Sequence, residues 1–196
     1  MNNTIKTIYQ RRAIRKYKDK PVPHELIEQV IDAGRMAPSA HNEQTWKFNV
    51  LTDKKRIKAF SDALKLGVAK GILKSGLRKT VKLVLDTLPF RHEEYAKASD
   101  IIFYGAPVVI FLSSVGDSEW NELEVGMCAQ NMMLAARSLG LDSCPIGSAK
   151  YLTETKLYSQ LKPAKKEKLH LAVILGYGAE KRVAFERKKD DVVFID

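Results

Sequence analysis

Two short, uninterrupted apolar runs constrain the fold of this chain more than any other feature. Residues 107–113 and 171–175 carry no charged side chain. A strand that is buried on both faces has this pattern, whereas a half-buried strand alternates apolar with polar residues. Both runs are far too short to cross a bilayer. They predict a small sheet that is covered by helices.

Two other segments have the spacing of helices that could cover such a sheet. The apolar residues between positions 25 and 36 recur at helical intervals, and Pro38 is expected to end that helix. Residues 119–139 predict a longer helix with small side chains among large ones, and Gly140 suits its C-terminal cap.

The remaining local patterns are shorter. Residues 46–50 alternate apolar with polar side chains and predict a strand, and Asp53 can cap a following helix. Residues 68–88 are basic and amphipathic, which favours a solvated or interface-packing helix over one on a membrane surface. Residues 192–195 form an isolated apolar run, which needs a sheet edge of its own chain or of a partner.

The chain has no internal repeat, low-complexity block or linker, so we expect one domain over residues 1–196. Its 45% hydrophobic content suits a compact domain or one half of an intertwined dimer. The predicted class is mixed α/β or α+β, with helices on a small sheet.

The charge and the cysteines restrict the setting. The net charge of +10 is compatible with general solubility, an anionic ligand or nucleic acid. No ribonucleoprotein-type aromatic motif or helix-turn-helix pattern supports nucleic acid. The first residues have no apolar core of a secretory signal. The two cysteines form no CxxC pair, so reduced thiols in the cytoplasm are expected.

Common catalytic motifs are missing from the sequence. There is no GxGxxG, P-loop lysine, HExxH or GxSxG. The four histidines are scattered, which argues against a metal site. Cys144 has no histidine or lysine beside it and is not expected to be a nucleophile. If the chain is an enzyme, a cofactor is therefore expected to carry the reaction.

Two clusters in the first quarter of the chain suit a bound ligand. Arg11, Arg12 and Arg15 offer planar guanidiniums that match phosphate, although a solvated basic turn has the same composition. Residues 37–46 combine small side chains, which let a planar ligand approach the backbone, with the amides of Asn42 and Gln44. A polar loop between a helix and a strand would look similar.

Two further clusters lie later in the chain. Residues 143–148 are expected to offer exposed backbone amides next to Gly147. Residues 187–189 are basic, and a charged tail is the simpler interpretation of that run taken alone.

Together and in this order, the clusters resemble the nitroreductase family. Residues 11–17, RRAIRKY, resemble the family's RRSxRxF opening, and residues 33–46 are similar to its AxxAPSxxNxQPW signature. Residues 124–141, with QNMMLAA and LGL, resemble its central QNLLLAAxxLGLG helix. The sequence LGYG at 175–178 and the basic pair 187–188 resemble its C-terminal end.

This resemblance implies an α+β sandwich that forms an intertwined homodimer with FMN at the subunit interface. FMN would take a hydride from NADH or NADPH and pass it to a small electrophilic acceptor such as a nitroaromatic or a quinone. No side chain need act as an acid or base. Residues 64–98 match no family motif and would shape access of the substrate.

The resemblance also implies roles for individual residues. The arginines of the first cluster and the basic pair 187–188 would hold the phosphate and the polar edge of the flavin. The second cluster would reach the flavin from the other subunit, and the third would lie along the ring. The predicted cofactor-binding residues are Arg11, Arg12, Ala13, Arg15, Pro38, Ser39, Ala40, Asn42, Gln44, Pro145, Ile146, Gly147, Arg187 and Lys188.

Some residues depart from the family pattern. Ala13 and Ala40 replace frequent serines, Thr45 replaces a proline, and Gly147 stands where some members have Glu. Each lost hydrogen bond costs about 1 kcal/mol, which a flavin site tolerates. Two alternatives stay open: a specialised or non-catalytic flavin binder, for example a dehalogenase-like protein, and a small nucleic-acid-binding protein favoured only by the charge.

Overall fold

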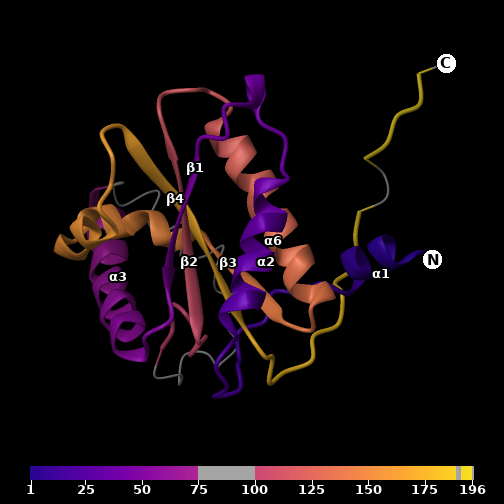
Figure 1. Cartoon of the computed structure of the whole chain (residues 1–196), viewed down its shortest axis with the longest axis horizontal. Helices are drawn as coiled ribbons and strands as arrows, with labels where there is room; N and C mark the ends of the chain where they lie inside the picture. Colours follow the sequence, from indigo (N-terminus) through magenta and orange to yellow (C-terminus); the bar gives the residue numbers. More distant parts are fainter. Residues whose placement is uncertain (75–99, 189–190, 196) are drawn as a thin grey trace.

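A four-stranded sheet stands between two helical layers (Figure 1). The structure is a computed structural model and describes residues 1–74, 100–188 and 191–195. Helices α2 (His24–Arg35) and α6 (Asn121–Ser138) cover one face of the sheet. Helix α3 (Lys54–Lys74) covers the other face.

All neighbouring strands of the sheet are antiparallel. The order is β1 (Trp46–Leu51), β2 (Val108–Val115), β4 (Glu167–Gly176) and β3 (Asp142–Ile146). The two apolar runs become the two central strands, β2 and β4, which confirms that they are buried. The α+β class with a small sheet covered by helices is likewise confirmed.

The runs 108–112 of β2 and 171–175 of β4 are apolar without interruption because each face of the sheet has its own core. Alternate residues of β2 point to opposite faces: Val108 and Ile110 belong to the core under α2 and α6, whereas Phe111 belongs to the core under α3. On the α3 side, the ring centroid of Phe111 lies 5.7 Å from that of Phe60 and 6.1 Å from that of Phe103.

The two long helical predictions are confirmed. Helix α2 ends at Arg35, and its cap residue Met36 lies two residues before Pro38. Helix α6 ends at Ser138 with Leu139 as its cap, and Gly140 follows with a φ of +78°, the left-handed conformation that suits glycine after a helix. A short helix, α1 (Asn3–Gln10), precedes the first arginine cluster.

Residues 143–148, which were expected only to offer exposed backbone amides, lie partly in a strand. Asp142–Ile146 form strand β3, which pairs with β4 from Asp142 to Ile146. Asp142, Ser143 and Pro145 interrupt the apolar pattern, so no strand period can be detected there. The 3₁₀ helices η3 (Gly147–Glu154) and η4 (Lys156–Leu161) follow.

The apolar run 192–195 joins no strand of this chain among the described residues. Its side chains are 64–94% exposed, and the segment runs away from the body past α1 (Figure 1). Residues 64–74 of the region predicted to shape the substrate pocket belong to α3; residues 75–98 lie outside the described part, as does most of the amphipathic stretch 68–88. No helix of the described residues is long and apolar enough to span a membrane.

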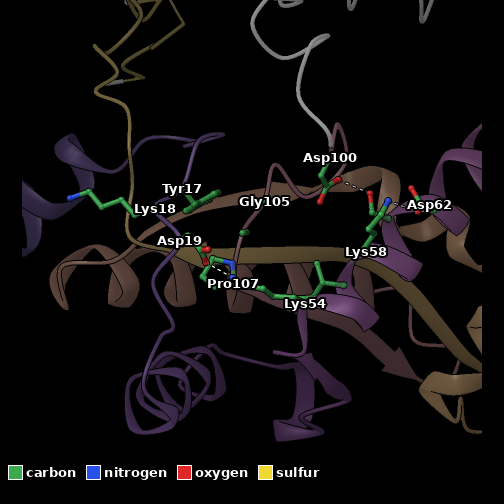
Figure 2. A pocket seen from close by; sticks show the side chains of 12 residues that line it. Tyr17, Lys18, Asp19, Lys54, Lys58, Asp62, Asp100, Gly105 and Pro107 are labelled. Atoms are coloured by element: carbon green, nitrogen blue, oxygen red, sulfur yellow. Dashed lines mark hydrogen bonds and ion pairs between the residues drawn. The ribbon is translucent and has the colours of Figure 1, made fainter.

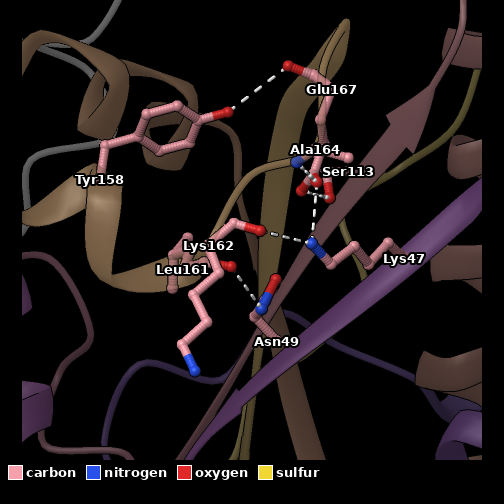
Figure 3. A network of polar contacts seen from close by, with 8 residues as sticks. All are labelled: Lys47, Asn49, Ser113, Tyr158, Leu161, Lys162, Ala164 and Glu167. Atoms are coloured by element: carbon pink, nitrogen blue, oxygen red, sulfur yellow. Dashed lines mark hydrogen bonds and ion pairs between the residues drawn. The ribbon is translucent and has the colours of Figure 1, made fainter.

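A buried carboxylate joins three strands at one end of the sheet (Figure 3). Glu167 of β4 accepts hydrogen bonds from Lys47 Nζ of β1 at 2.8 Å, Ser113 Oγ of β2 at 2.7 Å and the amide of Ala164 at 2.7 Å. Burial alone would raise the pKa of Glu167, but these hydrogen bonds hold it below its usual value.

Replacing Glu167 with Gln is expected to lower the free energy of unfolding at pH 7 by about 1–2 kcal/mol, because a neutral amide forms weaker bonds to the same donors. The folded pKa lies below the ordinary value of 4.5. As the pH falls below 4.5 and through the folded pKa, Glu167 becomes protonated, and the wild-type protein loses the stabilisation from its charged hydrogen bonds. The Glu167→Gln variant has no such contribution to lose.

Urea unfolding of both proteins at pH 7 and pH 4 measures the difference. Glu122→Gln is the control, because Glu122 is an exposed acid with one lysine partner, Lys168. An identical pH dependence in wild type and Glu167→Gln would contradict this account of the network.

Candidate functional site

The first arginine cluster lies in an extended segment against the edge of the sheet. Ala13 forms an isolated parallel bridge with Ser143 of β3, and the amide of Ile14 donates to the Ser143 carbonyl at 3.1 Å. The amide of Arg15 donates to Glu180 Oε1 at 2.5 Å. Because the segment is extended, its side chains alternate between two sides.

Arg11 and Arg15 project to the same side, towards Cys144 of β3. Burial raises the pKa of the Cys144 thiol, and the guanidiniums of Arg15 and Arg11 oppose this effect. The guanidinium carbon of Arg15 lies 5.9 Å from the ring centroid of Tyr104. The strand edge therefore carries two arginines on one side, a charge that matches a phosphate or a carboxylate.

Residues from the end of the chain add positive charge at the same place. Burial lowers the pKa of Arg11, and repulsion from Arg12 and Arg187 lowers it further, while Cys144 acts in the opposite direction. The structure thus brings the first and fourth clusters together, although 176 positions separate Arg11 from Arg187. Lys188 is exposed beside Arg187. A bound anion would relieve the repulsion between positive side chains gathered in this way.

Arg12 projects to the opposite side from Arg11 and Arg15. It lines a cavity of about 740 Å³ together with Arg137 and Arg182. Its Nη1 donates to the Arg11 carbonyl at 2.6 Å, while its Nε is buried with no hydrogen-bond partner among the described residues. A buried donor without an acceptor is costly, so an acceptor oxygen of a ligand would be stabilised there.

The third cluster ends the same edge strand. Pro145 and Gly147 are exposed, whereas Ile146 turns into the core under α3 and is 7% exposed. A Cβ added to Gly147 would meet nothing within 4 Å. The surface here is open and offers backbone and a proline ring to a planar ligand, while the Ile146 side chain is not available to it.

The second cluster lies elsewhere in the chain. Residues 38–44 contain the 3₁₀ turn η1 (Ala40–Asn42), and the amide of Ala40 donates to Glu124 Oε1 in the first turn of α6 at 2.7 Å. The arginine cluster lies beyond the other end of α6, near Arg137. With a rise of 1.5 Å per residue, Glu124 and Arg137 are about 20 Å apart. Within one chain, the second cluster therefore does not meet the others.

A separate cavity of about 360 Å³ lies between α3 and the segments 17–19 and 105–107 (Figure 2). None of the predicted site residues lines it. Its lining holds as many lysines as aspartates: Lys54 pairs with Asp19 and Lys58 with Asp62 at 2.9 Å, while Asp100 accepts a hydrogen bond from Ser61 at 2.5 Å and Lys18 lies at the rim. This pairing gives the cavity no excess charge that would select an ionic ligand.

Sequence reasoning assigned no role to Tyr104, Glu180 or Glu124, although the structure places them at the clusters. Tyr104 and Glu180 contact Arg15 from 89 and 165 positions away, which no local pattern reveals. Glu124 lies within the motif of the central helix. Local spacing predicts only that it belongs to the first turn of that helix, not that it binds Ala40. Among the described residues, no three His, Cys, Asp or Glu side chains are grouped to hold a metal ion.

Both thiols are expected to be inert in the folded protein. Cys128 and Cys144 have no exposed surface, and burial raises the pKa of each, that of Cys128 to about 12. Because the thiolate is the reactive form, a thiol reagent such as DTNB should label native protein at pH 8 about a hundredfold more slowly than protein in urea. Labelling of one thiol within the mixing time in buffer would contradict this expectation.

Comparison with known proteins identifies the family of the chain. The model of the nitroreductase family matches residues 8–177. An Archaeoglobus fulgidus protein, assigned as an NADH dehydrogenase/NAD(P)H nitroreductase, is 43% identical over 34% of this chain and 38% of its own length. The 4-nitrobenzoate reductase of Pseudomonas putida is 27% identical over 88% of this chain and 84% of its own length. The match thus spans just over a third of the first relative and most of the second.

A solved structure resembles the whole chain. The nitroreductase with bound FMN from Bacteroides fragilis superimposes with a TM-score of 0.79 at 25% identity, and the match covers 100% of both chains. The family model covers both the arginine segment and strand β4. The chain belongs to the nitroreductase family.

Proposed function

We propose that this chain is an FMN-dependent oxidoreductase that uses NADH or NADPH to reduce a small electrophilic acceptor such as a nitroaromatic or a quinone. The observation that carries the proposal is the group of Arg11, Arg15 and Arg187 beside the open end of β3. The Bacteroides fragilis relative binds FMN, and the Pseudomonas putida relative is a 4-nitrobenzoate reductase.

The positive side chains suit the phosphate of FMN. Arg11 and Arg187 lie within electrostatic reach of one another, and Lys188 adds a further charge nearby. The buried Nε of Arg12 has no acceptor among the described residues and would gain one from a phosphate or ribityl oxygen. These guanidiniums bind the anion and fix the orientation of the cofactor.

The remaining residues of the edge suit the flavin ring. FMN, when bound, supplies the hydride chemistry. Arg15 would place positive charge at the polar edge of the ring, where charge accumulates on reduction. The side chain of Ala13 lies on the same side of the extended segment as that of Arg15, and its small size leaves room for the flavin ring. Pro145 and Gly147 offer an exposed surface, with Ile146 contributing only its backbone.

We propose that the site is completed by a second copy of the chain. Because residues 38–44 lie about 20 Å from the arginines along α6, a flavin bound at those arginines would meet the Pro38, Ser39, Ala40, Asn42 and Gln44 of another subunit. Exposed apolar side chains near both ends of α6 support such an interface. They include Ile8, Tyr9, Met36, Trp120 and Leu123, which are 44–76% exposed.

The C-terminal tail fits the same assembly. Its apolar residues 192–195 pair with no strand of this chain among the described residues, and β1 lies at an edge of the sheet. We propose that the tail reaches the sheet edge of the partner. The buried thiols of Cys128 and Cys144 support a cytoplasmic location. The single domain over residues 1–196, with residues 64–98 shaping the substrate pocket, stays a prediction.

An anaerobic absorbance spectrum of the protein loaded with FMN, before and after NADH or NADPH, tests the function. The flavin bands are expected to bleach with at least one donor and to return when a nitroaromatic or a quinone is added. A protein that takes up FMN but is bleached by neither donor would support a non-catalytic flavin binder. A protein that takes up no FMN would overturn the proposal.

Charge-matched variants locate the FMN in the same experiment. Arg11→Met should raise the dissociation constant of FMN about tenfold or more, because it removes a charge-assisted hydrogen bond to the phosphate. Lys55→Met removes an exposed charge on α3 and should leave FMN binding unchanged. Equal effects of the two substitutions would contradict a phosphate site at Arg11.

The oligomeric state tests the shared site. The protein is expected to have the mass of a dimer by light scattering, and removal of residues 192–196 should weaken the dimer and FMN binding together, because the tail and the second cluster come from the same partner. A monomer that binds one FMN with undiminished affinity would contradict the shared site.

A further inference from the structure

The segment after α2 holds an unfavourable backbone conformation. His41, Asn42 and Gln44 have φ values of 52°, 57° and 50°, all in the left-handed region. A residue other than glycine pays about 1 kcal/mol or more for this conformation. Three such residues within four positions persist only where the surrounding structure holds them.

Part of the support comes from within the segment. Ser39 Oγ accepts a hydrogen bond from the amide of Gln44 at 3.0 Å, and Gln44 Nε2 donates to Asn42 Oδ1 at 3.0 Å. The side chains of this local network are partly or fully exposed, so water competes for these bonds. The local network alone does not attach the segment to the body of the protein.

Glu124 provides that attachment. Its side chain is buried, with 3% of the residue exposed, and its Oε1 accepts from the amide of Ala40 at 2.7 Å. The bond is charge-assisted and shielded from water, and the carboxylate lies in the first turn of α6, where the helix dipole favours negative charge. Asn121 in the same turn accepts from Thr45 Oγ1 at 2.8 Å, at the far end of the segment.

The carboxylate is only half satisfied. Glu124 Oε2 is buried and has no hydrogen-bond partner among the described residues. A buried acceptor left unpaired is destabilising, so a hydrophobic side chain would suit the packing of α6 as well. What Glu124 provides beyond packing is the fixed position of Ala40.

We propose that Glu124 is a positioning residue of the flavin site. Its carboxylate holds the segment 39–44, with His41, Asn42 and Gln44 in the left-handed conformation, in the shape that presents Ser39 and Asn42 to the FMN of the other subunit. Glu124 itself touches no cofactor and acts through the amide of Ala40. The inference rests on the proposed function, because it requires that FMN binds against this segment.

Three variants separate positioning from general stability. Glu124→Ala removes the acceptor for the Ala40 amide, whereas Glu124→Gln keeps a carbonyl oxygen in its place. Glu122→Ala is the matched control, since it removes an exposed carboxylate from the same turn of α6. The dissociation constant of FMN, from quenching of flavin fluorescence, is measured beside the melting temperature of the apoprotein.

Glu124→Ala is expected to raise the FMN dissociation constant at least about tenfold, the factor for one lost hydrogen bond to a charged group. Glu124→Gln should keep the FMN dissociation constant within about threefold of the wild-type value, and Glu122→Ala should leave that constant unchanged. Unchanged binding in Glu124→Ala, or an equal loss in Glu124→Gln, would overturn the inference. Wild-type protein that binds no FMN would instead overturn the proposed function.

If Glu124→Ala does not fold, Ala40→Pro removes the donor instead. Ala40 is the first residue of η1, a position that tolerates proline. Ser39 before it has φ −137° and ψ 147°, an extended conformation that is compatible with a following proline. Ala40→Pro should weaken FMN binding about tenfold, and Ala40→Pro/Glu124→Gln should lose no more, because the bond is already absent. Wild-type affinity in Ala40→Pro, or a further loss in the double variant, would overturn the inference.

Discussion

Strands β2 and β4 pair antiparallel at the centre of the sheet, and the helical layers and the edge strands are arranged around this pair. The runs 108–112 of β2 and 171–175 of β4 are apolar on both faces, so each face of the sheet needs a helical layer. The residues of β4 also give β3 its partner, although β3 has little strand pattern of its own. The buried Glu167 links three of the strands where the apolar core ends.

The candidate site lies at the β3 edge of that sheet. The segment after α1 runs along β3, and the extended backbone divides its arginines between two sides: Arg11 and Arg15 face Cys144, and Arg12 faces the cavity beside Arg137. The end of the chain returns to the same place with Arg187. A cationic surface thus forms from residues at both ends of the sequence.

Helix α6 separates the two halves of the proposed site. Its first turn holds the segment 39–44 through Glu124, and its last turn lies near the arginines. Because a straight helix keeps its ends about 20 Å apart over these residues, the length of α6 explains why the family's residues fall into two groups that one chain does not join. The proposed dimer follows from this length rather than from the charge or the composition.

The sequence by itself determined the two central strands, the helices α2 and α6 and the residues that resemble the family, because each has a local period or motif. The tertiary structure decided the strand at 142–146, the side on which each arginine lies, and the roles of Tyr104, Glu180 and Glu124. These features arise from contacts between residues far apart in the chain, and burial and hydrogen bonding across such separations leave no local pattern to detect.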